Sequence, residues 1–217
     1  MDRRRFSLML GAALLLAQTP APAPELDWHD ARSLRVEGLG FKDVKSPYDR
    51  LPQRAEGLVR DVVWNLSRDA SGVLVRFVTN ATAIHARWTL TNKTLTIANS
   101  TPIACSGLDL YAKTDAGRWH WLATGRPNKF PENNETLATG IPAGTREYIL
   151  YLPLHNPVTS LEIGVPKGNT IQPGPARPAG RKPIVFYGTS ITHGFAASRA
   201  GMTHVAILGR VFDREVI

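Results

Sequence analysis

Hydrophobic and polar positions alternate along most of the chain between residues 28 and 166. The clearest example is Ala83–Leu90 (AIHARWTL), which places Ile84, Ala86, Trp88 and Leu90 on one face and His85, Arg87 and Thr89 on the other. The same period of two recurs in residues 72–79 (GVLVRFVT), 148–154 (YILYLPL) and 159–165 (TSLEIGV). Such alternation predicts β-strands that bury one face.

Turn residues separate these predicted strands. Residues 108–113 (LDLYAK) and 119–125 (WHWLATG) flank the sequence TDAG, which predicts a hairpin. Gly, Pro and Asn break the pattern at intervals of about 8–15 residues, and no amphipathic helical window of useful length lies between the strands. We therefore predict a mainly β fold, an antiparallel and jelly-roll-like β-sandwich, over residues 25–166.

The pattern changes after residue 166. Residues 167–182 are rich in Pro and Gly and predict a linker. Pro183–Gly188 (PIVFYG) is a short apolar run typical of a strand in a parallel sheet, and residues 214–217 (REVI) resemble the start of another. Between them, a helix over Gly201–Asp213 would bury a stripe made of Met202, Val205, Leu208 and Phe212.

Residues 183–217 thus predict the first βα unit of an α/β domain. One such unit is too small to cover both faces of a parallel strand. We therefore expect this second domain to be incomplete in the chain.

Residues 1–24 have the composition of a secretory signal peptide. Three arginines, Arg3 to Arg5, precede an apolar run from Phe6 to Ala17, and small residues and prolines follow. The run is too short for a stable membrane anchor. We expect an exported protein, periplasmic or extracellular. The sequence RRRF fits a twin-arginine signal as well as an ordinary Sec signal, so both routes stay open.

Charge and cysteine content exclude several classes of function. The net charge is +8, but the basic residues are scattered and form no run that would follow a phosphate backbone, so we expect no nucleic-acid partner. Cys105 is the only cysteine, which excludes an internal disulfide and a thiolate metal site. We expect no metal and no cofactor.

A serine follows the predicted strand in a turn of small residues. Gly188, Thr189 and Ser190 lead from this strand towards a helix, which would present a hydroxyl at the carboxyl end of a parallel sheet, where ligands collect. Backbone N–H groups in such a turn can also face a developing oxyanion. From the residues alone, Ser190 is either a nucleophile or a side chain that satisfies turn hydrogen bonds.

Two motifs resemble those of a known family. Residues 186–194 (FYGTSITHG) resemble the first conserved block of the SGNH (GDSL) hydrolases, and residues 106–113 (SGLDLYAK) resemble the GxDLY signature of a β-sandwich domain that precedes the SGNH domain in one bacterial subgroup. The resemblance covers about residues 28–217. It implies a flavodoxin-like α/β hydrolase domain that hydrolyses esters or transfers acyl groups without a metal.

The resemblance also implies roles for single residues. Ser190 matches the nucleophile, and its backbone N–H would be one oxyanion donor; Gly188, Thr189 and His193 are candidates for lining the pocket. Thr189 stands where the commoner motif has aspartate, as in the resembled subgroup. None of the six histidines lies in an Asp-x-x-His sequence, so we expect the triad Asp and His to be absent and the chain to be inactive.

The substrate expected from the resemblance is an ester of a carbohydrate or small metabolite. An acyltransferase that uses the same serine is an alternative. A non-catalytic carbohydrate-binding sandwich is another, because Trp64, Trp88, Trp119 and Trp121 could stack on sugar rings, although packing in the core or on a sheet face explains most of them. The sequence does not predict an oligomeric state.

Overall fold

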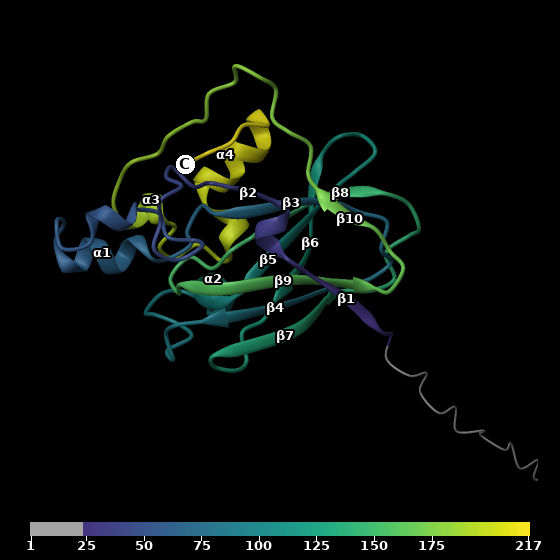
Figure 1. Cartoon of the computed structure of the whole chain (residues 1–217), viewed down its shortest axis with the longest axis horizontal. Coiled ribbons are helices and arrows are strands. Elements are labelled where there is room, and N and C mark those ends of the chain that lie inside the picture. Colours follow the sequence, from purple (N-terminus) through teal and green to yellow (C-terminus); the bar gives the residue numbers. More distant parts are fainter. Residues whose placement is uncertain (1–23) are drawn as a thin grey trace, which may run out of the picture.

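The computed structural model describes residues 24–217, so residues 1–23 of the predicted signal peptide lie outside the described residues. Its elements form two packed sheets with helices on one side (Figure 1). The strands are β1 (Leu26–Asp30), β2 (Arg35–Glu37), β3 (Leu74–Thr79), β4 (Ile84–Leu90), β5 (Leu108–Lys113), β6 (Trp119–Gly125), β7 (Glu132–Ala138), β8 (Arg146–Tyr151), β9 (Val158–Pro166) and β10 (Ile171–Pro173). The α-helices are α1 (Asp61–Ser67), α2 (Pro102–Ser106), α3 (Ser190–His193) and α4 (His204–Phe212), and the 3₁₀ turns are η1 (Ala31–Ser33), η2 (Gln53–Ala55) and η3 (Ala200–Met202).

Antiparallel pairing between these strands confirms the predicted β-sandwich. One sheet has four strands in the order β1-β9-β4-β7. The other has the order β10-β3-β8-β5-β6, with β2 also paired to β3. The predicted hairpin is β5 and β6, whose pairing runs from Leu108 opposite Gly125 to Lys113 opposite Trp119.

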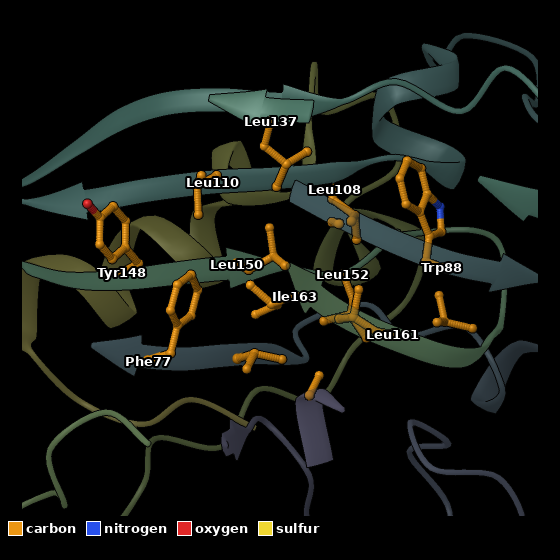
Figure 2. Close-up of a cluster of buried hydrophobic side chains, with 14 of the residues drawn as sticks. Phe77, Trp88, Leu108, Leu110, Leu137, Tyr148, Leu150, Leu152, Leu161 and Ile163 are labelled. Carbon is orange, nitrogen blue, oxygen red and sulfur yellow. The ribbon is translucent and has the colours of Figure 1, made fainter. Parts of the chain in front are cut away.

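The inward faces of the two sheets form the main core (Figure 2). In β4 the alternation agrees with the sequence prediction, since Ile84, Ala86, Trp88 and Leu90 are buried and Arg87 is exposed. The indole N–H of Trp88 donates to the carbonyl of Ser106 at 3.0 Å, so burial of this ring leaves no unpaired donor.

Two short helices between the strands were not predicted. In α2, Pro102 occupies the first turn and the Thr101 hydroxyl accepts a hydrogen bond from the Ala104 N–H at 3.1 Å. The helix α1 has Asp61 in its first turn and only seven residues. Helices of one or two turns are too short to show an amphipathic period, so only their capping residues signal them. Within residues 24–217, no helix has both the length and the apolarity needed to cross a bilayer.

The six-stranded sheet also buries its outer face. Leu74, Tyr111, Ile149 and Tyr151 point away from the main core and pack with Leu154, and with Ala104 of α2, Ala200 of η3 and Ala206 of α4. Residues 200–212 thereby form a third layer on this sheet (Figure 1). Burial on both faces explains the continuous apolar run at residues 148–151 (YILY) of β8.

The predicted apolar stripe of the last helix is correct for Val205, which is buried, and wrong for Met202 and Phe212. The helix begins only at His204, because the Thr203 hydroxyl accepts the Ala206 N–H at 3.1 Å, which leaves Met202 outside it. Its buried residues are Val205, Ala206 and Gly209, whereas Met202 and Phe212 are 41% and 53% exposed. The small residues Ala206 and Gly209 allow close approach to the sheet and to Val216, and this contact decides which face is buried.

The two predicted parallel strands that flank this helix meet. Ile184 forms a parallel bridge with Val216, and the Ile217 N–H donates to the Ile184 carbonyl at 2.9 Å. The two flanking segments therefore run parallel and are joined by one bridge, with helices between them, as expected for the start of an α/β domain.

The Pro- and Gly-rich segment between the two parts is attached to the sandwich. Ile171–Pro173 forms β10 on the edge of the six-stranded sheet, within the predicted linker. The Gly174 N–H then donates to the Arg76 carbonyl at 2.9 Å. The chain continues around α4 towards α3, as Figure 1 shows.

Candidate active site

Ser190 is the first residue of α3, and its side chain is exposed. Two residues before it, Gly188 lies against the Thr192 side chain. A Cβ at position 188 would overlap the Thr192 hydroxyl, which favours glycine there. The Ser190 carbonyl accepts the N–H groups of Gly194 and Phe195 at 3.1 and 2.9 Å. Gly194, with φ of 103°, ends the helix after one turn. This arrangement holds the serine at a sharp turn with its hydroxyl open to solvent.

His193 faces the sandwich. Its Nε2 lies 2.5 Å from the Leu154 carbonyl and 3.5 Å from Oδ2 of Asp69, and its Nδ1 lies 3.3 Å from a guanidinium nitrogen of Arg50. The hydroxyl of Ser71 donates to the backbone carbonyl of His193 at 2.5 Å. These partners come from residues 50–71 and 154. His193, which shares the one-turn helix α3 with Ser190, is therefore bound by the sandwich domain.

Burial shifts the protonation of this cluster. It lowers the pKa of His193 to about 4, helped by the positive charge of Arg50. It raises the pKa of Asp69 to about 7, although Arg50 opposes that shift. The imidazole and the carboxyl are therefore both neutral between about pH 4 and 7, and their contact is no ion pair there.

The same cluster includes a second imidazole, that of His155. The His155 ring stacks on that of His193, with centroids 4.7 Å apart and planes 3° from parallel. Suitable ligand atoms of Asp69, His155 and His193 lie within 4.8 Å of one another, which is close enough for a metal ion to be considered.

A second contact between the domains uses the aspartate of the GxDLY sequence. Asp109 is buried, and its Oδ2 accepts the Gly201 N–H at 2.8 Å and lies 3.3 Å from Nε of Arg199. Burial raises the pKa of Asp109 to about 6, against the effects of the Gly201 N–H and the Arg199 charge. Next to it, Arg210 lies over the Tyr111 ring at 4.1 Å and donates to the Tyr151 hydroxyl at 3.0 Å.

This sequence motif is therefore part of the interface that carries α4. Its glycine, Gly107, has no space for a side chain, because a Cβ would lie 2.5 Å from the Gly125 carbonyl and 2.7 Å from the Ile103 carbonyl. The aspartate and the tyrosine hold residues 199–210 through the contacts above.

Gly201→Ala tests this interface. The new Cβ would lie 2.7 Å from Oδ2 of Asp109 and would overlap the Tyr111 ring. We expect a loss of about 1–3 kcal/mol in the free energy of unfolding and faster amide exchange in α4. Gly209→Ala is the comparison within the same helix: its Cβ would come within 3.3 Å of a side-chain atom of Val216, a milder overlap, and alanine favours a helix interior, so we expect a smaller loss. Equal behaviour of the two variants would contradict the importance of this contact.

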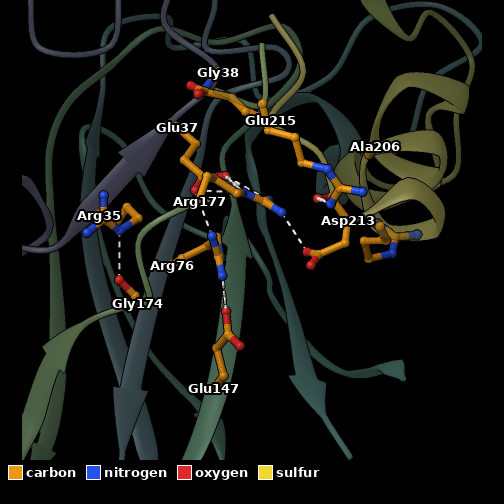
Figure 3. A network of polar contacts seen from close by, with 12 residues as sticks. Arg35, Glu37, Gly38, Arg76, Glu147, Gly174, Arg177, Ala206, Asp213 and Glu215 are labelled. Atoms are coloured by element: carbon orange, nitrogen blue, oxygen red, sulfur yellow. Dashed lines mark hydrogen bonds and ion pairs between the residues drawn. The ribbon is translucent and has the colours of Figure 1, made fainter. Parts of the chain in front are cut away.

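A third contact is a network of charged side chains (Figure 3). Arg76 of β3 lies 2.8 Å from Glu37 and also pairs with Glu147 of β8. Arg177 pairs with the other oxygen of Glu37 at 2.9 Å and with Asp213, at the end of α4, at 2.6 Å. Arg177 thus joins the segment before the candidate nucleophile to both domains.

Comparison with known proteins assigns the chain. Residues 26–171 match the family model "GxDLY: N-terminus of Esterase_SGNH_hydro-type", which is more than half of the sequence. The chain belongs to the SGNH (GDSL-like) hydrolase family. Residues 181–217 also match the "GDSL-like Lipase/Acylhydrolase family", the segment that holds Ser190.

Two solved structures resemble this chain. A protein of Bacteroides ovatus ATCC 8483 assigned as a GDSL-like lipase is 30% identical, with a TM-score of 0.81 over 89% of this chain and 56% of its own. The salicylyl-acyltransferase SsfX3 from a tetracycline biosynthetic pathway is 20% identical, with a TM-score of 0.60 over 90% of this chain and 53% of its own, and shows a shared fold. The chain therefore spans little more than half the length of these proteins. A search of curated proteins gave no match.

Proposed function

We propose that Ser190 is the nucleophile of an exported SGNH-type serine esterase that acts on an ester of a carbohydrate or small metabolite. The observation that carries this proposal is an exposed serine at the first turn of a helix, which follows a glycine turn and a segment joined to Val216 by a parallel bridge at Ile184. In this mechanism the Ser190 oxygen attacks the acyl carbon, and the alcohol leaves. The Ser190 N–H is one donor to the oxyanion, and water then releases the acyl group.

The described residues do not provide an evident base for Ser190. A serine hydroxyl needs a histidine, oriented by a carboxylate, to accept its proton. In residues 24–217, His193 is the only histidine within 4.0 Å of a carboxylate oxygen, and its ring nitrogens face Leu154, Asp69 and Arg50 rather than Ser190. We infer that the triad Asp and His come from outside this chain.

Export is part of the proposal. It rests on the basic and apolar composition of residues 1–24. The sugar-binding alternative gains little from the aromatic residues, because Trp64 and Trp88 are buried. Trp121 is 51% exposed, but the guanidinium of Arg199 lies 4.9 Å from its ring and occupies one face.

The test compares two lengths of the protein. We expect the 217-residue chain to hydrolyse p-nitrophenyl acetate no faster with Ser190 than with the Ser190→Ala variant. We expect the product of the full reading frame around this sequence to hydrolyse it, and Ser190→Ala to lower kcat by about 10⁴-fold to 10⁶-fold.

Two outcomes would contradict these expectations. Ser190-dependent turnover by the 217-residue chain would mean that a base lies within it. Absence of turnover by the longer protein, over acetyl esters of sugars and small alcohols, would contradict the esterase. Adding alcohol acceptors to the same assay distinguishes hydrolysis from acyl transfer.

A further inference from the structure

We infer that His193 is a positioning residue, through which the β-sandwich fixes the orientation of the Ser190 helix. This inference rests on the proposed role of Ser190. The His193 ring and backbone are surrounded by Arg50, Asp69, Ser71 and the Leu154 carbonyl, which together form the His193 socket.

The socket selects one tautomer of the ring. A guanidinium can only donate hydrogen bonds, so Nδ1 of His193 accepts from Arg50 and carries no proton. Nε2 then carries the proton and donates it to the Leu154 carbonyl. Arg50 is itself held by the carbonyls of Asp69 and Leu66, at 2.9 and 2.5 Å. Both ring nitrogens are therefore satisfied by groups of the sandwich.

The helix that carries Ser190 depends on contacts of this kind. It has four residues, too few for a helix to be stable by itself. Ser190 and His193 lie three residues apart, on one turn of this helix. The Ser71 hydroxyl binds the His193 backbone, while Gly194 and Phe195 bind the Ser190 carbonyl. Fixing His193 therefore fixes the backbone that places the serine hydroxyl.

A metal ion in the same cluster is the competing explanation. Asp69, His155 and His193 have suitable spacing. However, a metal on Nε2 of His193, with Nδ1 still accepting from Arg50, would require an imidazolate ring. The positive charge of Arg50 also opposes cation binding. The arrangement favours the hydrogen-bonded socket.

Amide hydrogen exchange on the 217-residue chain tests the inference without any assay of activity. We expect His193→Ala to accelerate exchange at Gly194 and Phe195 by at least about tenfold, with β3 and β8 unchanged. His193→Gln should stay within about threefold of the wild type, because one amide can accept from Arg50 and donate to the Leu154 carbonyl. His120→Ala, at an exposed histidine of β6, is the control for loss of an imidazole.

Two exchange results would overturn the socket. One is unchanged exchange in His193→Ala; the other is exchange in His193→Gln that is as fast as in His193→Ala. Titration with Zn²⁺ alone, followed by ¹⁵N signals of the histidine rings, should leave the Nε2–H tautomer of His193 in place. Saturable loss of that signal would replace the socket with a metal site. Failure of the esterase proposal would leave these exchange rates unaffected, so the two proposals fail separately.

Discussion

Arg76→Met is expected to lower the free energy of unfolding by about 3 kcal/mol, at the lower end of the range for breaking a buried ion pair. The Arg76 side chain is 4% exposed, and the carboxylates of Glu37 and Glu147 that it joins are 5% and 10% exposed. Removing the guanidinium leaves two carboxylates with little access to water. Arg177 still pairs with the Glu37 carboxylate, and Lys113 still pairs with the Glu147 carboxylate, which limits the loss.

Urea unfolding followed by circular dichroism measures this effect. The matched control is Arg87→Met on the outer face of the four-stranded sheet, where Arg87 and Glu162 are 44% and 32% exposed. Arg87 also lies 4.4 Å from the Trp28 ring, and the combined loss should be at most about 1 kcal/mol. Equal losses in the two variants would show that burial does not decide the strength of the Arg76 network.

The second large effect is a dependence of stability on pH that His193→Gln removes. Burial, with the charge of Arg50, lowers the pKa of His193 from 6.5 to about 4, so the folded state binds this proton less readily than the unfolded state. The stability that the neutral ring provides is complete above pH 6.5 and is lost as pH falls towards 4. The difference corresponds to about 3 kcal/mol.

The measurement is urea unfolding of both proteins at several pH values between 4 and 8. Relative to the wild type, His193→Gln should gain about 3 kcal/mol between pH 7 and pH 4. Burial raises the pKa of Asp69 to about 7, so its contribution has the opposite sign, but Asp69 is present in both proteins. His120→Gln is the control at an exposed histidine. A constant difference between wild type and His193→Gln would contradict a buried, neutral His193.

The sequence predicted the elements whose pattern is repeated over six or more residues. In β4 the alternation of Ile84, Ala86, Trp88 and Leu90 identifies the buried face without further information. The helix predicted over Gly201–Asp213 shows that hydrophobic periodicity does not always identify the buried face. Periodicity alone favoured Met202 and Phe212, whereas close packing of Ala206 and Gly209 against other elements decides the buried face.

The site was predictable only in part. Ser190 could be found because glycine and small residues mark its turn, and a family motif surrounds it. The partners of His193 could not, because Arg50, Asp69 and Ser71 lie more than a hundred residues away along the chain. Sequence position alone assigned His193 to a pocket, and that role stays a prediction. The burial of Asp69 and Ser71, which distinguishes them from other polar residues, is visible only in the structure.

The apolar outer face of the six-stranded sheet makes it unfavourable to transfer this sandwich to another protein without the segment that covers it. Leu74, Tyr111, Ile149 and Tyr151 are buried in part by Ala200 and Ala206, which lie in the segment that covers that side of the sheet. A recombination event that transferred residues 25–173 alone would uncover an apolar surface and leave Asp109 without the Gly201 N–H. We therefore expect a sandwich of this type that occurs alone to carry polar residues at those four positions.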